Sequence, residues 1–139
     1  MTHLLDTSAL LAHYLAEPGA TRVQALFEDA AVVAGTSILA LFEFDLRLHQ
    51  LGIDAATRAA ELNRYRALLN EVVNVDEVIR SEGVRLRISA TARASAMDTL
   101  IAATASVRGA TLVHRDPHFT AIPASMLKQE MPPPKKQGN

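Results

Sequence analysis

The sequence contains no cysteine and no tryptophan among its 139 residues. Without cysteine, a disulfide framework and a thiolate metal site are both excluded, which is consistent with a reducing compartment. Aromatic residues make up only 4% of the chain, which disfavours the stacking platforms of many single-strand binders. The formal net charge of −1 provides no general attraction to a phosphate backbone. Any argument for nucleic-acid binding must therefore rest on a local site.

Long apolar runs are also missing. A stretch such as 38–42 is far shorter than the roughly 18 residues that a membrane-spanning helix needs. Asp6 interrupts the first apolar stretch, so we expect no signal peptide. A chain of 139 residues fits one compact domain. We therefore expect one soluble, cytoplasmic domain without membrane contact.

Short apolar segments alternate with helical patterns along the chain. The expected strands cover 3–6, 31–34, 72–75, 111–114 and, as a last edge strand, 121–127. The expected helices begin after Thr7 or Ser8, near Pro18, at Ile38, near Asp54, near Glu77 and at Met97. This alternation predicts an α/β domain over residues 1–129, with a parallel sheet covered on both faces. Residues 130–139 have too little apolar surface to offset their ordering entropy, so we expect a disordered tail.

Four acidic residues are candidates for one site. Asp6 follows the first expected strand and Asp116 follows a later one, so a parallel sheet would bring both to the same edge. Asp98 opens a helix and Glu43 lies inside another, and either could project toward that edge. Each acid also has an ordinary interpretation, as a helix cap, a first-turn charge, an Asp-Pro turn or a surface pair with Arg47.

The chemistry of clustered carboxylates favours a divalent cation. Such groups raise one another's pKa unless protons or a cation compensate their charge. A site of oxygen ligands, without cysteine or a close histidine pair, suits Mg²⁺ or Mn²⁺ better than zinc. We therefore expect Asp6, Glu43, Asp98 and Asp116 to hold Mg²⁺ (or Mn²⁺), with Asp45 as an alternative to Glu43.

Three residues around Asp116 have open interpretations. His114 and His118 flank it and could form a metal pair, although His114 also fits the end of a strand. Arg115 could contact a substrate phosphate or simply be solvated.

Three segments of the sequence resemble the PIN-domain nucleases: Leu5-Asp6-Thr7-Ser8-Ala9, Met97-Asp98-Thr99-Leu100-Ile101-Ala102-Ala103 and Leu112-Val113-His114-Arg115-Asp116-Pro117-His118-Phe119. The resemblance covers nearly the whole chain except the tail. Size and motif order look most like the VapC-type ribonuclease toxins of prokaryotic toxin–antitoxin pairs. By position, the resemblance implies that the same four acids are catalytic and metal-binding, with Thr7 or Ser8 as a supporting hydroxyl.

The resemblance also implies a fold, an activity and partners. It implies a three-layer α/β/α PIN-like domain and a metal-dependent endoribonuclease that hydrolyses RNA, tRNA being a plausible target. The implied partners are a cognate VapB-type antitoxin, which can place an arginine among the acids, and a second copy in a homodimer. One alternative is a catalytically silent PIN-like domain that binds RNA or protein. Another is a phosphatase with Asp6 as nucleophile, but the second aspartate expected two residues later is missing.

Overall fold

Strands and helices alternate along the chain in the computed structural model, which describes residues 1–132. The elements are β1 (His3–Leu5), α1 (Thr7–Tyr14), α2 (Ala20–Glu28), β2 (Ala34–Ser37), α3 (Ile38–Gln50), α4 (Ala55–Leu68), β3 (Glu71–Val73), α5 (Glu77–Ser89), α6 (Ala96–Val107), β4 (Thr111–Val113), the 3₁₀ turn η1 (Pro117–Ala121) and β5 (Gln129–Glu130). In residues 1–132, no helix has the length and apolar character needed to span a bilayer.

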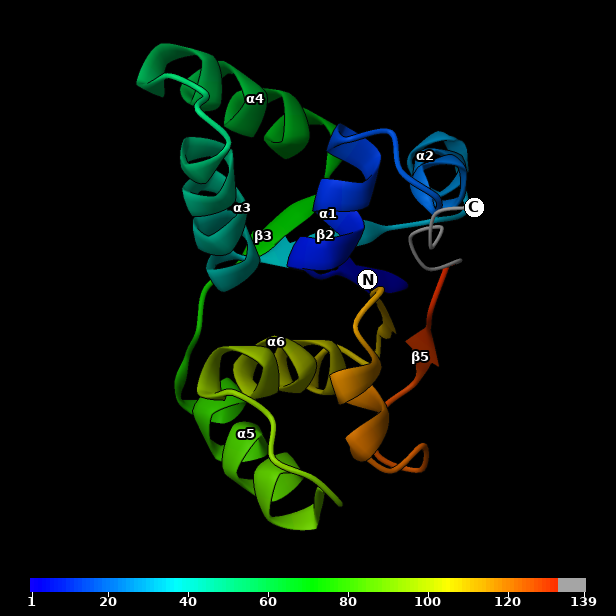
Figure 1. Ribbon diagram of the computed structural model, residues 1–139. Coiled ribbons are helices and arrows are strands. Elements are labelled where there is room, and N and C mark those ends of the chain that lie inside the picture. The colour runs from blue at the N-terminus through cyan, green and yellow to red at the C-terminus, as the bar shows by residue number, and fades with distance from the viewer. Residues whose placement is uncertain (133–139) are drawn as a thin grey trace, which may run out of the picture.

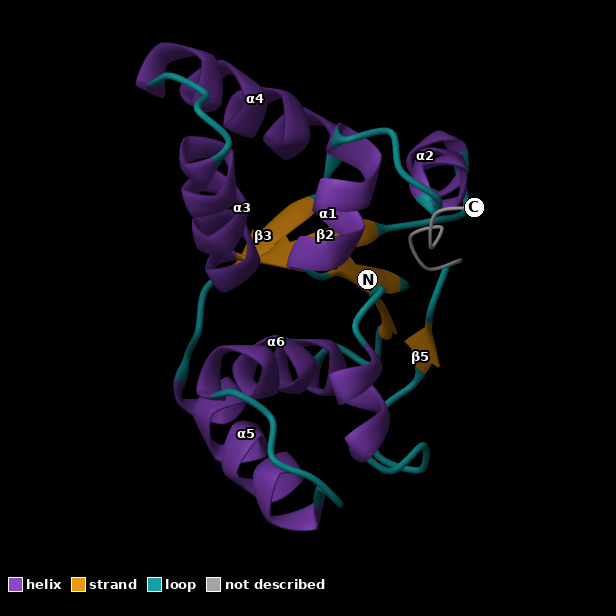
Figure 2. Cartoon of the chain, in the orientation of Figure 1, coloured by secondary structure: helices purple, strands orange, loops and turns teal. Residues whose placement is uncertain are grey.

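A parallel sheet forms the centre of the molecule. Its five strands lie in the order β3-β2-β1-β4-β5, and every neighbouring pair is parallel. Figure 1 shows α1 to α4 on one side of this sheet and α5 with α6 on the other. Figure 2 shows the same arrangement as three layers, with the strands between the helices. The predicted α/β/α architecture is therefore confirmed.

The central strands are buried because helices cover both faces of the sheet. Leu4, Leu5, Leu112 and Val113 of β1 and β4 have no exposed surface. Such short strands need little alternation between apolar and polar residues, since neither face meets water. The inner strands therefore form a rigid base for the residues that follow them.

Helix caps place several polar residues at the carboxyl edge of the sheet. Asp6 directly follows β1 and caps α1, whereas Ser37 ends β2 and caps α3. Helix α6 leads into β4, so its capped N-terminus at Ser95 returns to this same edge. Ligands of open α/β sheets generally bind at this edge.

The expected second strand at 31–34 was wrong. The strand is Ala34–Ser37, and all four of its residues are buried. Its limits come from pairing: Leu5 lies opposite Thr36, whose hydroxyl donates a 2.7 Å hydrogen bond to the Leu5 carbonyl. Pairing and burial have here outweighed the strand preference of the valines before it.

The expected edge strand at 121–127 was also wrong. Pro123 cannot donate a backbone hydrogen bond to a sheet, and its carbonyl accepts one from the Met126 amide at 2.9 Å, which closes a turn. The edge strand is β5, two residues long. Its Glu130, where the tail was expected to begin, accepts two hydrogen bonds from the Arg22 guanidinium at 2.7 and 2.9 Å. Residues 133–139 lie outside the described residues, so the expectation for them stays a prediction.

Candidate active site

Asp6 is buried at the end of β1, with 4% of its surface exposed. Its Oδ1 accepts hydrogen bonds from the Ser8 hydroxyl at 2.7 Å and from the Ala9 amide at 2.9 Å. The ordinary interpretation as a helix cap is therefore correct. It does not explain why a carboxylate stands where asparagine or serine would cap as well, because burial penalises the charge.

Ser8 links Asp6 to the loop after β4. While its hydroxyl donates to Asp6, its oxygen accepts a 2.8 Å hydrogen bond from the Arg115 amide. The Asp6 amide in turn donates to the Val113 carbonyl at 3.1 Å. These contacts hold the ends of β1 and β4 together, and so fix Asp6 relative to the segment that carries Asp116.

Asp116 begins η1 and is partly exposed. Its Oδ1 accepts a 2.9 Å hydrogen bond from the His118 amide and lies 2.9 Å from Nδ1 of the same histidine. The Asp-Pro turn interpretation is thus also correct. Since β4 lies beside β1 in the sheet, this turn occupies the same edge as Asp6.

Glu43 reaches the site from α3. Its Oε1 accepts a 2.9 Å hydrogen bond from the Thr7 hydroxyl, which belongs to the first turn of α1. Asp45 instead pairs with Arg58, at 2.9 Å between Oδ1 and Nε. The structure therefore places Glu43, and not Asp45, beside the other acids. The possible pair between Glu43 and Arg47 is not formed, because Arg47 contacts Gln50.

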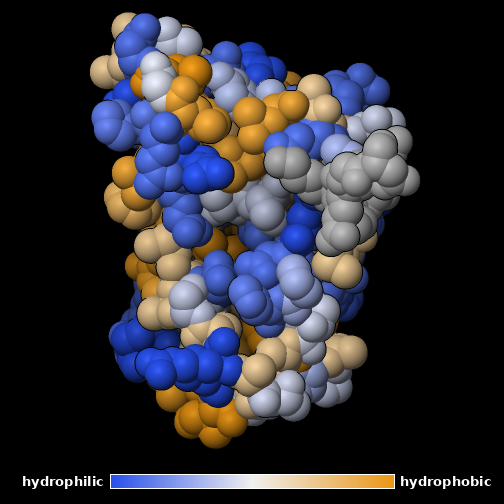
Figure 3. Space-filling model, in the orientation of Figure 1, coloured by the Kyte–Doolittle hydropathy of each residue, from blue (hydrophilic) through white to orange (hydrophobic). Residues whose placement is uncertain are grey.

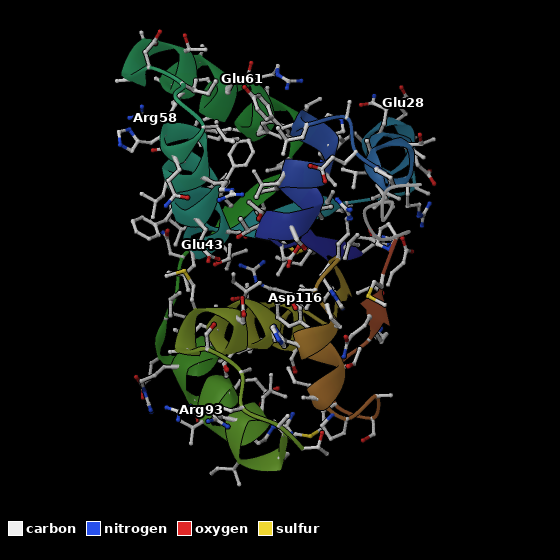
Figure 4. The ribbon with its side chains drawn as sticks, viewed as in Figure 1. Glu28, Glu43, Arg58, Glu61, Arg93 and Asp116 are labelled. Atoms are coloured by element: carbon white, nitrogen blue, oxygen red, sulfur yellow. The ribbon has the colours of Figure 1, made fainter. Side chains whose placement is uncertain are left out.

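Asp98 lies in the first turn of α6, where its amide donates to the Ser95 hydroxyl at 3.1 Å. Its charge acts on both Asp6 and Glu43, which shows that α6 brings it near the other acids. In Figure 4, Glu43 lies on the part of α3 that faces α6, and Asp116 lies beside α6. All four predicted acids therefore gather between α3, α6 and the ends of β1 and β4.

The pKa values of three of these acids are raised. Burial, with smaller contributions from Asp98 and Asp116, raises the pKa of Asp6 to about 7 against the hydrogen bonds from Ser8 and Ala9. Burial and the charge of Asp98 raise the pKa of Glu43. Burial and the charge of Asp116 raise the pKa of Asp98. Burial and mutual repulsion therefore both disfavour the charged forms of these three acids.

The fit of a divalent cation can be judged from this donor set. In residues 1–132, no lysine or arginine forms an ion pair with Asp6, Glu43 or Asp98. Nor do three or more acidic or histidine side chains of these residues form a ready-made metal cage. Mg²⁺ usually keeps several waters and takes only one or two carboxylates directly, so a wide cluster of oxygen donors fits it.

The histidine pair is not supported as a metal ligand set. His114 is fully buried; its Nε2 contacts Gln129 Oε1 at 2.8 Å and its Nδ1 accepts from the Asp116 amide at 3.1 Å. Both ring nitrogens are thus engaged, and burial lowers the pKa of this imidazole. Gln129 lies on β5, whereas the sequence predicted the edge strand at 121–127. The local sequence therefore gives no sign of the contact between His114 and Gln129.

Arg115 is not solvated. Its side chain is only 9% exposed and its Nη1 lies 3.2 Å from a Glu17 carboxylate oxygen. Its Nε is buried without a hydrogen-bond partner in residues 1–132. The local sequence does not reveal this burial, because the partner Glu17 is distant in the chain.

Comparison with known proteins agrees with the fold. The family model of the PIN domain matches residues 3–124. The chain belongs to the PIN domain family. A search among curated proteins finds no match to this sequence.

Solved structures with the same fold come from several bacteria. The PIN chain described here is similar to a chain of VapBC2 from Rickettsia felis bound to a DNA fragment from their promoter, with a TM-score of 0.77, 20% identity, and coverage of 96% of this chain and 100% of that one. It is also similar to DNA-bound VapBC from Salmonella typhimurium, with a TM-score of 0.73, 19% identity, and coverage of 94% and 98%. A third is the Sarcin-Ricin loop cleaving toxin VapC20 of Mycobacterium tuberculosis, with a TM-score of 0.64, 21% identity, and coverage of 86% and 94%.

Proposed function

We propose that this PIN-domain chain is a metal-dependent endoribonuclease and the toxin of a VapBC-type toxin–antitoxin pair. The observation that carries the proposal is the gathering of Asp6, Glu43, Asp98 and Asp116 at the carboxyl edge of the sheet, three of them with raised pKa values and without a lysine or arginine partner in residues 1–132. Such an arrangement is costly unless a cation binds there. The similarity to VapBC structures and to a Sarcin-Ricin loop cleaving toxin supports the same assignment.

Mg²⁺ or Mn²⁺ is the cation that these carboxylate donors would hold. The chemistry supplied by such an ion is activation of a water and neutralisation of charge on the leaving oxygen of a phosphodiester. Asp6 is firmly oriented to act as a ligand, because Ser8 and Ala9 donate to the same oxygen. No covalent intermediate with the protein is required.

Glu43 is suited to move a proton. Its Oε1 accepts from Thr7, whereas Oε2 has no hydrogen bond within the described residues. A carboxylate with a raised pKa is a better proton acceptor near neutral pH than an ordinary glutamate. We assign Oε2 of Glu43 as the acceptor of the proton that the attacking water loses.

The proposed partners follow from the same assignment. The substrate is RNA, and structured RNA such as tRNA is a plausible class because the low net charge leaves recognition to shape and to local groups. A VapB-type antitoxin would block the acids, and an arginine from it would pair well with them. A homodimer would cover the exposed apolar face of α3, where Phe42 and Leu46 are 57% and 45% exposed.

One alternative is a silent PIN-like domain that binds RNA or protein without cutting. It is favoured by the absence, in residues 1–132, of a ready-made cage of three metal ligands. A silent domain would not explain why a carboxyl group is buried at Asp6, and we therefore rank this alternative second.

The test uses the purified chain, freed of any antitoxin, with total RNA from its host. Reactions contain Mg²⁺, Mn²⁺ or EDTA, and the Asp98→Asn variant is run beside the parent protein. We expect discrete fragments that require the metal and disappear with EDTA and with the variant. RNA that stays intact in every reaction with folded protein would favour the silent domain.

A further inference from the structure

A pocket of about 460 Å³ lies between α5, the segment that follows it and the start of α6. Its volume is within the range of roughly 300–1,000 Å³ that is usual for small-ligand sites. The residues around this arginine pocket include Arg80, Arg87 and Arg93, with apolar side chains of α5 and α6 beside them. The acids described above are not among them.

Two of the three arginines in the pocket have no partner among residues 1–132. Arg80 pairs with Glu77 on its own helix, at 2.5 Å between Nη2 and Oε1. Arg87 and Arg93 are exposed and make no hydrogen bond or ion pair within residues 1–132. The pocket therefore presents two positive charges that no carboxylate of the described chain neutralises.

The other walls of the pocket are apolar. Val84 and Ile88 lie one helical turn apart on α5 and are 51% and 80% exposed. Leu100 of α6 packs close to Gly83, where an added Cβ would come within 3.2 Å of a Leu100 methyl group, so the two helices approach tightly at the floor. In Figure 3, hydrophobic and strongly hydrophilic surface lie side by side over this part of the molecule.

The arginine pocket adjoins the acidic site. Ser95 lines the pocket and, through its hydroxyl, caps the helix turn that carries Asp98. Thr99, the residue after Asp98, also lines the pocket. With 3.6 residues per turn, successive residues of a helix lie about 100° apart around its axis, so the pocket and Asp98 lie on adjacent sides of one turn. Figure 4 shows Arg93 beside this end of α6.

We propose that the arginine pocket holds an unstacked nucleotide of the RNA strand next to the phosphodiester that is cleaved. The inference rests on the proposed function and adds a subsite for recognition. Arg87 and Arg93 bind the flanking phosphates, and Val84, Ile88 and Leu100 contact the base. A chain with few aromatic residues can still hold a base, because apolar side chains also pack against the faces of an unstacked base.

Charge complementarity favours RNA over a protein segment as the occupant. With a formal net charge of −1, the chain has no general attraction for RNA, so local cations near the acids must attract the strand. Unpaired arginines beside an apolar wall match the alternation of phosphate and base in a nucleotide. The four acids would repel phosphates, and the neighbouring Arg87 and Arg93 offset that repulsion.

The experiment measures binding of fluorescein-labelled, randomised single-stranded RNA by fluorescence anisotropy. All proteins carry Asp98→Asn, so that the RNA stays uncut, and are measured between about 50 and 200 mM salt, the range over which phosphate contacts strongly change affinity. The test variants are Arg93→Ala, Arg87→Ala and Ile88→Ser. The matched controls are Arg66→Ala, an exposed arginine of α4 without a partner in residues 1–132, and Val78→Ser, an exposed residue of α5 outside the pocket.

Arg87→Ala and Arg93→Ala should each reduce the slope of log affinity against log salt concentration by about 0.7. Ile88→Ser should weaken binding about threefold or more at constant slope, because it removes apolar contact and no charge. The controls should match the parent. Circular dichroism spectra identical to those of the parent confirm that each variant is folded.

Three results would overturn the subsite. If the pocket variants and the controls bind RNA equally while the wild-type chain cleaves RNA, the subsite is wrong and the proposed function stands. If the pocket variants lose only binding to the cognate antitoxin, the occupant is a protein. If the parent neither binds nor cleaves RNA, the proposed function and the subsite fail together.

Discussion

The Thr7 hydroxyl donates a 2.9 Å hydrogen bond to Oε1 of Glu43, and thereby joins the first turn of α1 to the middle of α3. The contact links two elements that are 36 residues apart in sequence. It orients Glu43 toward the site that Asp6 begins, since Thr7 directly follows Asp6. This pair decides which acid of α3 belongs to the site.

Glu43→Gln should lower RNA cleavage by at least about a hundredfold, since loss of a charged ligand or proton acceptor removes several kcal/mol of transition-state stabilisation. Asp45→Asn is the matched control on the same helix. It should leave cleavage unchanged and lower the free energy of unfolding by less than about 1 kcal/mol, because its pair with Arg58 is partly exposed. Cleavage rates and urea denaturation measure the two effects. The reverse pattern would assign Asp45 to the site.

Ser8→Ala should destabilise the fold by about 1–3 kcal/mol, because the Arg115 amide would lose its partner in a partly buried position. Cleavage should fall about tenfold, which corresponds to a loss of about 1.4 kcal/mol in orienting Asp6. Thermal unfolding and RNA cleavage are measured together. Ser81→Ala, at an exposed position of α5, is the control. Unchanged stability and cleavage in Ser8→Ala would show that the link between β1 and β4 does not depend on this hydroxyl.

The free energy of unfolding of the metal-free protein should change with pH as Asp6 titrates. Its pKa is raised from 3.8 to about 7, so its contribution to stability is fully present below 3.8 and is lost as the pH rises through about 7. Asparagine caps a helix equally well but has no charge. Asp6→Asn should therefore gain stability relative to the parent as the pH rises over this window.

The comparison with Asp6→Asn is needed because other groups titrate nearby. Asp98 and Asp116 face Asp6, and burial lowers the pKa of His114, whose contribution to stability is instead lost on acidification. Melting temperatures of both proteins are recorded in EDTA from about pH 4 to about pH 8, a range that spans the ordinary and raised pKa values. If the difference between the two melting temperatures does not change with pH, the raised pKa of Asp6 is contradicted.

Mg²⁺ should stabilise the folded chain, because an ion that binds only the folded state shifts the unfolding equilibrium. At one hundred times its Kd, the gain would be about 2.7 kcal/mol. Asp98→Asn should show a much smaller shift of the melting temperature, and KCl at equal ionic strength should show none. An equal shift in Asp98→Asn and the parent would place the ion elsewhere.

Phe42→Ser should convert a homodimer into a monomer, since Phe42 is the most exposed large apolar residue of α3. Light scattering after gel filtration measures the mass. Val33→Ser removes a similarly exposed apolar residue outside α3 and should remain dimeric. If the parent protein is monomeric, the proposed homodimer is wrong.

Local signals were sufficient to locate most of the helices and three of the four acids. Asp6 and Asp116 stand where strands end, and Asp98 stands in a capped first turn; each position is recognisable within a few residues. Helix α3 begins at Ile38, where the sequence predicts it. Periodicity, caps and turns act over short distances along the chain, so they can be recognised without the fold.

Tertiary structure alone decided the contacts that join distant segments. The choice of Glu43 over Asp45 depends on Thr7 and Arg58, and the burial of Arg115 depends on Glu17. The limits of β2 and β5 likewise follow from pairing with β1 and β4 rather than from the preferences of their own residues. Sequence by itself determined the alternation of elements and the acids at their ends, because those follow from local chemistry. Which side chains meet depends on how the sheet and the helices pack.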